Sequence, residues 1–144
     1  MAGIKFLGIR LRAFSQATEV EERVLKAMQF ASGIEEIAIT RTEGHFGNPI
    51  SVFEIEMAKS GQMNRFLERL RASGILTSLE GQVDARTDDG CAFHFRLDKQ
   101  KAYLEELALA TGKDVIDVRM KVAAYPAKRE SAVQNLKDWL SEQA

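Results

Sequence analysis

The sequence predicts a single α+β domain in which a mainly antiparallel sheet carries its helices on one face, a two-layer sandwich. The chain has 144 residues, the commonest domain length and too few for two independent cores. Several segments alternate between apolar and polar residues, as half-buried strands do, and others repeat apolar residues at helical spacing. Since such strands have one apolar face, the other face of the sheet should meet water.

The first half of the chain predicts a strand, a helix and a hairpin. Residues 4–14 alternate, with Leu7, Ile9, Leu11 and Ala13 on one face and Phe6, Gly8, Arg10 and Arg12 on the other. A capping box of Thr18 and Glu21 starts a helix over residues 18–32, and Gly33 ends it. Residues 36–43 and 50–57 alternate again and read as a hairpin, with Phe53, Ile55 and Met57 on one face.

The second half predicts the remaining layers. A helix should bury Met63, Phe66, Leu67 and Leu70, and a weaker helical segment Ile75, Leu79 and Val83, before a turn at residues 88–90. The next strand has Cys91, Phe93, Phe95 and Leu97 on its apolar face. Residues 98–110 favour a short helix to about Glu105 and then a strand before the turn at 111–114. The last strand buries Ile116, Val118, Met120 and Val122, and the final helix, opened by Pro126, buries Val133, Leu136 and Leu140.

Composition indicates a cytoplasmic protein without a membrane segment. The lone cysteine, Cys91, has no partner for an internal disulfide, and the chain opens without the pattern of a targeting segment. No apolar run approaches the ~20 residues that cross a bilayer.

The formal net charge of -1 hides a segregation of charge along the chain. Residues 1–14 carry three cations and no acid, residues 15–61 carry eight carboxylates against four cations, and residues 96–129 carry eight cations against five carboxylates. Folding could join the two basic segments into one positive patch or scatter their cations over the surface.

Catalytic and metal-binding patterns are weak, so we expect no enzyme, metal or cofactor. Cys91 and His94 have near-metal spacing, but their odd separation places them on opposite faces of a strand. Glu43 and His45 could act as acid and base in a nuclease, although carboxylates beside hairpin loops are usually only solvated. The loop at residues 44–47 matches the GXXG pattern of a loop that joins two helices in KH domains and clamps a nucleic-acid backbone. Here it would join two strands, and glycines with positive φ in a turn are the better interpretation, while His45 and Asn48 could still contact RNA.

Two places could contact phosphates. The outward sheet face would carry Arg10, Arg12, Arg96, Arg119 and Lys121, opposed by Glu36, Glu54, Glu56 and Asp117. These arginines cluster if the first strand lies near the last, or form cross-strand pairs if the strands interleave. The second place is the start of the final helix, where Lys128 and Arg129 face an unfavourable helix dipole, and where they could bind a phosphate together with Lys99.

Three segments, TEGHFGNPI (42–50), RLDKQKAY (96–103) and AAYPAKRE (123–130), together resemble an archaeal family described as RNA-binding or predicted exosome subunits. That resemblance covers nearly the whole chain and implies a fold similar to large-subunit ribosomal protein five. It also implies RNA contact, a link to RNA processing or degradation, and exosome or ribosome-related proteins as partners. Lys101 and the plain TGKD turn depart from the family's pattern without affecting the fold.

The leading hypothesis is a non-catalytic domain that recognises structured RNA through phosphate contacts, because aromatic residues for stacking unpaired bases are sparse. Only Phe6, Phe14, Phe46 and Tyr125 are candidates for such stacking. The alternative is a protein-interaction module, such as a homodimer formed through an edge strand or the open sheet face. The predicted RNA-binding residues are Arg10, Arg12, His45, Asn48, Arg96, Lys99, Gln100, Arg119, Lys121, Lys128 and Arg129.

Overall fold

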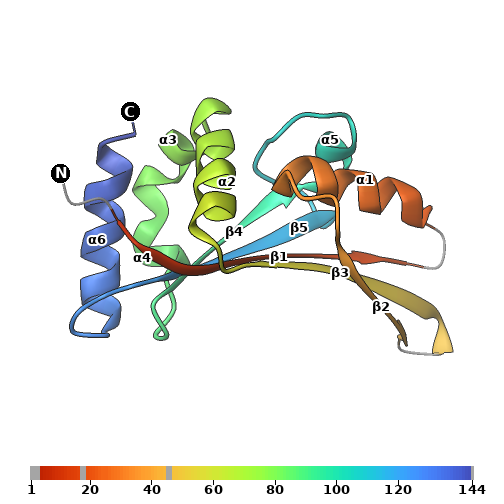
Figure 1. Ribbon diagram of the computed structural model, residues 1–144, viewed down its shortest axis with the longest axis horizontal. Coiled ribbons are helices and arrows are strands. Elements are labelled where there is room, and N and C mark those ends of the chain that lie inside the picture. Colours follow the sequence, from red (N-terminus) through yellow and green to blue (C-terminus); the bar gives the residue numbers. More distant parts are fainter. Residues whose placement is uncertain (1–3, 17–18, 45–46, 144) are drawn as a thin grey trace. The chain divides into compact units, whose positions relative to one another are not determined.

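A computed structural model describes residues 4–16, 19–44 and 47–143 and contains one open antiparallel sheet (Figure 1). The five strands are ordered β2-β3-β1-β5-β4. Their bounds are β1 Phe6–Ser15, β2 Ala38–Glu43, β3 Pro49–Met57, β4 Ala92–Asp98 and β5 Val115–Val122. The hairpin of β2 and β3 is antiparallel, with Ala38 opposite Glu54 and Glu43 opposite Pro49, as the alternation in the sequence predicts.

The helices belong to two compact units. The first unit comprises Met1–Ile9, Met57–Phe95 and Arg119–Ala144, and the second Arg10–Glu56 and Arg96–Val118. The first contains α2 (Ser60–Ala72), α3 (Ile75–Leu79), the 3₁₀ turn η2 (Glu80–Gln82), α4 (Val83–Arg86) and α6 (Arg129–Ser141). The second contains α1 (Glu21–Ser32) and α5 (Lys99–Tyr103). In each unit the helices cover one face of its strands, which confirms the predicted two-layer α+β sandwich (Figure 1).

Alternation along the strands produces the buried face of the sheet. On β5, Ile116, Val118, Met120 and Val122 are buried and the residues between them are not, as predicted. Phe53, Ile55 and Met57 of β3 are likewise buried. Burial of these side chains supplies the main stabilising free energy, at about 25 cal/mol per Å² of apolar surface. In the part of the chain that the structure describes, no helix is long and apolar enough to span a membrane.

The first strand departs from its predicted pattern at its beginning. Phe6 is buried and Leu7 is 53% exposed, the reverse of the prediction, whereas Ile9, Leu11 and Ala13 are buried as expected. Phe6 packs edge-on against Trp139 of α6, with ring centroids 5.3 Å apart. Docking of this large aromatic pair therefore outweighs strict alternation at the start of β1.

Other boundaries also differ. α1 begins at Glu21 after Val20 and not at residue 18, and the predicted cap Thr18 lies outside the described residues. The final helix begins at Arg129, because Pro126 belongs to the segment that leads into it. The strand predicted after α5 is reduced to a single bridge between Leu97 and Leu109.

Two glycines should respond oppositely to the same substitution. Gly33 ends α1 in the left-handed conformation, with φ of 75°. Gly61 lies in the first turn of α2, where a Cβ would meet no atom within 4 Å. Gly33→Ala should lower the free energy of unfolding by about 1 kcal/mol, because L residues are strained at positive φ. Gly61→Ala should raise it by up to ~1 kcal/mol through higher helix propensity. Urea denaturation of both variants measures this, and a shift of the same sign in both would contradict it.

Candidate nucleic-acid interface

The open sheet face of the second unit carries Arg10 and Arg12 from β1 and Arg96 from β4. Arg12 Nε lies 2.7 Å from Glu54 Oε2, and Arg96 Nε lies 3.1 Å from Asp117 Oδ1. The Arg96–Asp117 pair is solvent-exposed, whereas the Arg12–Glu54 pair is half-buried. Exposed pairs contribute ~0–1 kcal/mol, so Arg96 can exchange its carboxylate for a phosphate at little cost.

Strand order decides how these charges are arranged. β1 lies between β3 and β5, so it has both an acidic and a basic neighbour. The first strand thus lies beside the last, which was the order expected to cluster the arginines. Within the second unit, Arg12 nevertheless pairs with Glu54 and Arg96 with Asp117 across strands. No carboxylate in the described chain forms an ion pair with Arg10.

The open face of the first unit carries Arg119 and Lys121, two residues apart on β5. Both are half-buried, and neither has an ion pair among the residues that the structure describes. Residues with this separation on a strand point to the same face and lie about 7 Å apart. Because carboxylate partners are missing, these two side chains leave positive charge on this face.

Near that face, His94 and Asp88 form a separate pair. His94 Nε2 lies 2.7 Å from Asp88 Oδ2, and Asp88 Oδ1 accepts hydrogen bonds from the amides of Gly90 and Ala92, each at 2.9 Å. Burial acts to raise the pKa of Asp88, but the hydrogen bonds from His94, Ala92 and Gly90 outweigh it and hold the pKa below its usual value. Asp88 is therefore an ionised residue of the turn, and the neighbouring Cys91 is buried. In the ranges that the structure describes, no cluster of three metal-binding side chains occurs.

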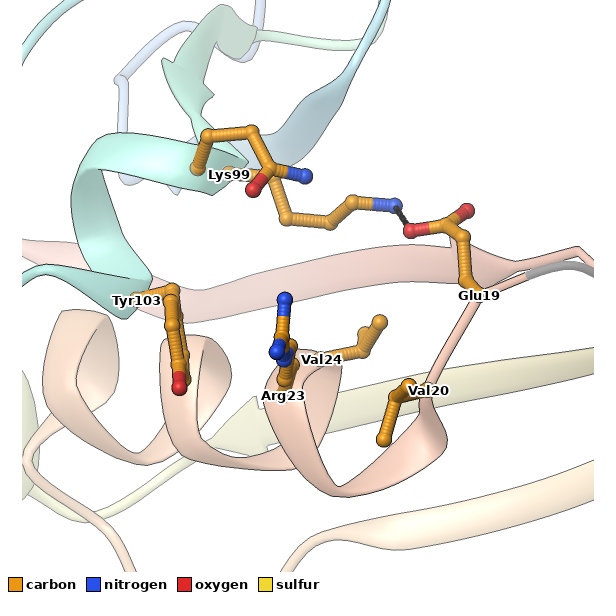
Figure 2. Close-up of a pocket in the computed structure, with 7 residues that line it drawn as sticks. Glu19, Val20, Arg23, Val24, Lys99 and Tyr103 are labelled. Atoms are coloured by element: carbon orange, nitrogen blue, oxygen red, sulfur yellow. Dashed lines mark ion pairs between the residues drawn. The ribbon is translucent and has the colours of Figure 1, made fainter.

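Lys99 is enclosed inside the second unit and does not lie on a surface. It is 4% exposed, and its ammonium lies 2.8 Å from Glu19 Oε2 and 2.7 Å from Asp114 Oδ1. Its third proton is donated to the carbonyl of Phe14 at 2.8 Å. Figure 2 shows the Lys99 side chain reaching across to Glu19. An ammonium has three donors, so Lys99 has none left for a phosphate.

The pKa of Asp114 reflects its contacts with Lys99 and Gln100. Burial acts to raise the pKa of Asp114, but hydrogen bonds from Lys99 and Gln100 and the charge of Lys99 outweigh it and lower the pKa below its usual value. Gln100 Nε2 donates to Asp114 Oδ2 at 2.6 Å. The amide of Gln100 thus orients the carboxylate as well as facing solvent.

A hollow of about 210 Å³ lies beside this cluster, between α1 and α5 (Figure 2). Its wall includes Tyr103, and the cations of Arg23 and Lys26 lie 5.5 Å and 5.2 Å from the centre of the Tyr103 ring. Such cation–π contacts contribute about 0.5–1 kcal/mol at exposed sites. The sequence analysis did not single out Arg23 or Lys26, and nothing in the sequence linked them to Tyr103, 77 residues beyond Lys26.

The remaining predicted residues are dispersed. Asn48 is exposed in the β2–β3 loop, where its carbonyl accepts the Gly44 amide. Gly47 has φ of 75°, as the turn interpretation predicts, whereas Gly44 does not have a positive φ. His45 lies outside the described residues.

Lys128 is the exposed residue preceding α6, with no side-chain cap. Arg129, in contrast, donates to the carbonyls of Thr87 at 3.1 Å and Asp84 at 2.5 Å and ties α6 to α4. The described contacts therefore do not support a phosphate site shared by Arg129 and Lys99.

Comparison with known proteins identifies the family. A family described as RNA binding matches residues 8–122. The chain belongs to this RNA-binding family. An RNA-binding protein of Pyrococcus abyssi, PAB1135, is 41% identical over 97% of both chains. The crystal structure of AF2318 from Archaeoglobus fulgidus has 33% identity and a TM-score of 0.84 over 94% of this chain and 99% of that one. Mth689 from Methanothermobacter thermautotrophicus has 30% identity and a TM-score of 0.78 over 94% and 98%.

The segment matched to the RNA-binding family contains the cations of both open faces. Arg10, Arg12, Arg96, Arg119 and Lys121 lie within residues 8–122, whereas Lys128 and Arg129 lie beyond them. Among the aromatic candidates, Phe6 is buried, Phe14 is 42% exposed and Tyr125 is 93% exposed. Phe46 lies outside the described residues. Structure thus reduces the described stacking candidates to two.

We expect Lys99 to act in stability. Lys99→Met should lower the free energy of unfolding at neutral pH by about 2 kcal/mol, because Glu19 and Asp114 lose a charged hydrogen-bond partner. The matched control is Lys101→Met, an exposed residue two positions on, which should change it by less than about 0.5 kcal/mol.

Low pH should reduce the difference in unfolding free energy between wild type and Lys99→Met. A carboxyl group whose pKa is lowered by folding stabilises the fold above its unfolded pKa, near ~3.9 for Asp, and loses this contribution as the pH falls through its folded pKa. The gap between wild type and Lys99→Met should therefore shrink below about pH 4. Urea denaturation between neutral pH and about pH 2 measures it, and a gap that stays constant would contradict the assignment.

Proposed function

We propose that this chain is a non-catalytic RNA-binding protein whose open sheet faces contact the phosphates of structured RNA. The observation that carries the proposal is the pair Arg119 and Lys121, on a face without helices and without carboxylate partners among the described residues. Membership of the RNA-binding family supports RNA as the polyanion. In the first unit the contacting residues are Arg119, Lys121 and Lys128, and in the second Arg10, Arg12 and Arg96.

The proposed set is narrower than the one the sequence predicts. Lys99 is left out because its three donors are engaged inside the fold. Arg129 is left out because its guanidinium donates to the carbonyls of Thr87 and Asp84. Asn48 and Gln100 are kept for base edges, since both are exposed amides, and His45 stays a prediction. Phosphate contacts from an open sheet face depend on the shape and charge of a folded RNA rather than on its sequence.

The cellular context stays a proposal that rests on the resemblance. We propose a link to RNA processing or degradation, with the exosome as a partner, in a protein that acts as one domain. Purification of the tagged protein from its native cells, with RNase treatment before elution, tests this. Exosome subunits that remain bound after RNase would support it, and their loss would contradict a direct contact.

Salt dependence of RNA binding tests the phosphate contacts. Arg119→Gln and Lys121→Gln should each weaken binding of a structured RNA and flatten the slope of log affinity against log salt by about one unit, because each neutralised phosphate releases counterions. The matched control is Lys137→Gln, since Lys137 is paired with Asp84 on the helical side of the same unit. A slope unchanged in both β5 variants, or equally changed in the control, would contradict the proposal.

Absence of catalysis is tested separately. Purified protein incubated with labelled RNA, with Mg²⁺ or Mn²⁺ and with EDTA, should leave the RNA intact, because no metal-binding cluster occurs among the described residues. Glu43→Gln is the informative variant, since Glu43 ends β2 beside the loop that contains His45. Metal-dependent cleavage that disappears in Glu43→Gln would show that the chain is a nuclease.

One observation favours the alternative of homodimerisation. β2 is an edge strand, and all six of its residues are exposed. An unpaired edge can add the strand of another chain. Sedimentation equilibrium distinguishes the two functions: a dimer that is disrupted by Thr40→Pro and binds no RNA would favour the protein-interaction module.

A further inference from the structure

A second hollow lies in the first unit, at the segment that connects the end of β5 to the start of α6. It measures about 370 Å³, and its lining includes Leu7, Cys91, Lys121 and Tyr125, together with residues 122–124. All of these residues belong to the first unit. The hollow is separate from the cavity beside Lys99 in the second unit.

Exposed apolar side chains gather at this hollow. Tyr125 is 93% exposed and Leu7 is 53% exposed, so two of the six exposed large apolar residues of the described chain line one small cavity. A tyrosine so fully exposed contributes almost no buried area to folding. No hydrogen bond of its phenol occurs within the described residues. The ring is thus free to contact a ligand.

One residue that lines the hollow has an unusual backbone conformation. Cys91 is a buried non-glycine residue with φ of 64°, a conformation that L residues adopt at a cost. Two backbone hydrogen bonds hold it there: its amide donates to the Asp88 carbonyl at 3.2 Å, and its carbonyl accepts the Val122 amide at 2.9 Å. Backbone that is already hydrogen-bonded in its lining conformation needs little further ordering when a ligand binds.

Polar groups at the rim match a nucleotide. Lys121 has no ion pair among the described residues and offers a cation for a phosphate. Asp89 is the only carboxylate among the lining residues, and it can accept a hydrogen bond from a base amino group, as carboxylates do from cytosine N4. An aromatic ring, an aliphatic side chain, a cation and one acceptor form a suitable set for a stacked base with its phosphate.

We propose that this hollow takes one unpaired nucleotide of the bound RNA, with its base stacked on Tyr125 beside Leu7 and its phosphate at Lys121. This inference rests on the proposed RNA-binding function and deepens it. Bases inside a duplex are already stacked on each other, so only a bulged, looped or terminal nucleotide can enter. The ligand is then a structured RNA that carries an unpaired nucleotide beside its stem.

Two RNAs that differ by one nucleotide test the proposal. One is a fully paired hairpin stem, and the other is the same stem with a single bulged 2-aminopurine, whose fluorescence falls when it stacks. Wild-type protein should bind the bulged RNA more tightly and quench its fluorescence. Tyr125→Ala should abolish the preference, a loss of roughly five- to hundredfold in affinity for the bulged RNA, because a stacked base contributes about that much. Affinity for the paired stem should stay unchanged.

Two further variants test whether the effect is specific to the aromatic ring of Tyr125. Tyr125→Phe keeps the ring and should keep both the preference and the quenching. Leu104→Ala removes another exposed apolar residue, 72% exposed in the second unit, and should match wild type. Thermal melts of all variants check folding, which the exposure of Tyr125 predicts to be unaffected.

The outcomes separate this proposal from the one on which it rests. Equal binding of both RNAs by wild type, or an unchanged preference in Tyr125→Ala, overturns the nucleotide site while RNA binding stands. Equal losses in Tyr125→Ala and Leu104→Ala also overturn it, because the effect would be general. Failure to bind either RNA overturns both proposals.

Discussion

Burial of one face of the sheet is the constraint on which the rest of this structure depends. Buried and more exposed residues alternate along β3 and β5, so packing the apolar residues against helices leaves the opposite residues facing water. Cations on β1, β4 and β5 are placed on that opposite face by the same alternation that builds the core. Any function of those cations is therefore a consequence of the packing, because a slip of one residue in register would bury them.

Charges inside the fold behave differently from charges on the open faces. Lys99 is surrounded by two carboxylates and a carbonyl, so its desolvation is offset locally and its position is fixed. Arg129 likewise uses its guanidinium to satisfy carbonyls near the end of α4. Arg119 and Lys121 have no such partners in the described chain, which makes them available to a polyanion. Partner geometry, and not charge alone, separates a structural cation from a binding one.

Large apolar residues likewise separate into those that pack inside the fold and those left in solvent. Phe6 was expected on the open face, yet it packs against Trp139, whereas Leu7 and Tyr125 are left in solvent beside one hollow. Stacking of an unpaired base on Tyr125 would add to phosphate contacts what those contacts lack, a preference for one feature of the RNA. Membership of an RNA-binding family and a cavity of this chemistry thus support each other from independent observations.

By itself, the sequence determined the α+β class, the antiparallel hairpin, the buried faces of β3 and β5 and the apolar side of α6, because each depends on periodicity within one segment. Three segments together were also enough to predict the family, since their combination and spacing are specific. Only the tertiary structure decided that Arg12 meets Glu54, that Lys99 is enclosed, and that Tyr125 and Leu7 line one hollow. These contacts join residues 42, 80 and 118 positions apart, and local patterns carry no information about which distant side chains a packed core brings together.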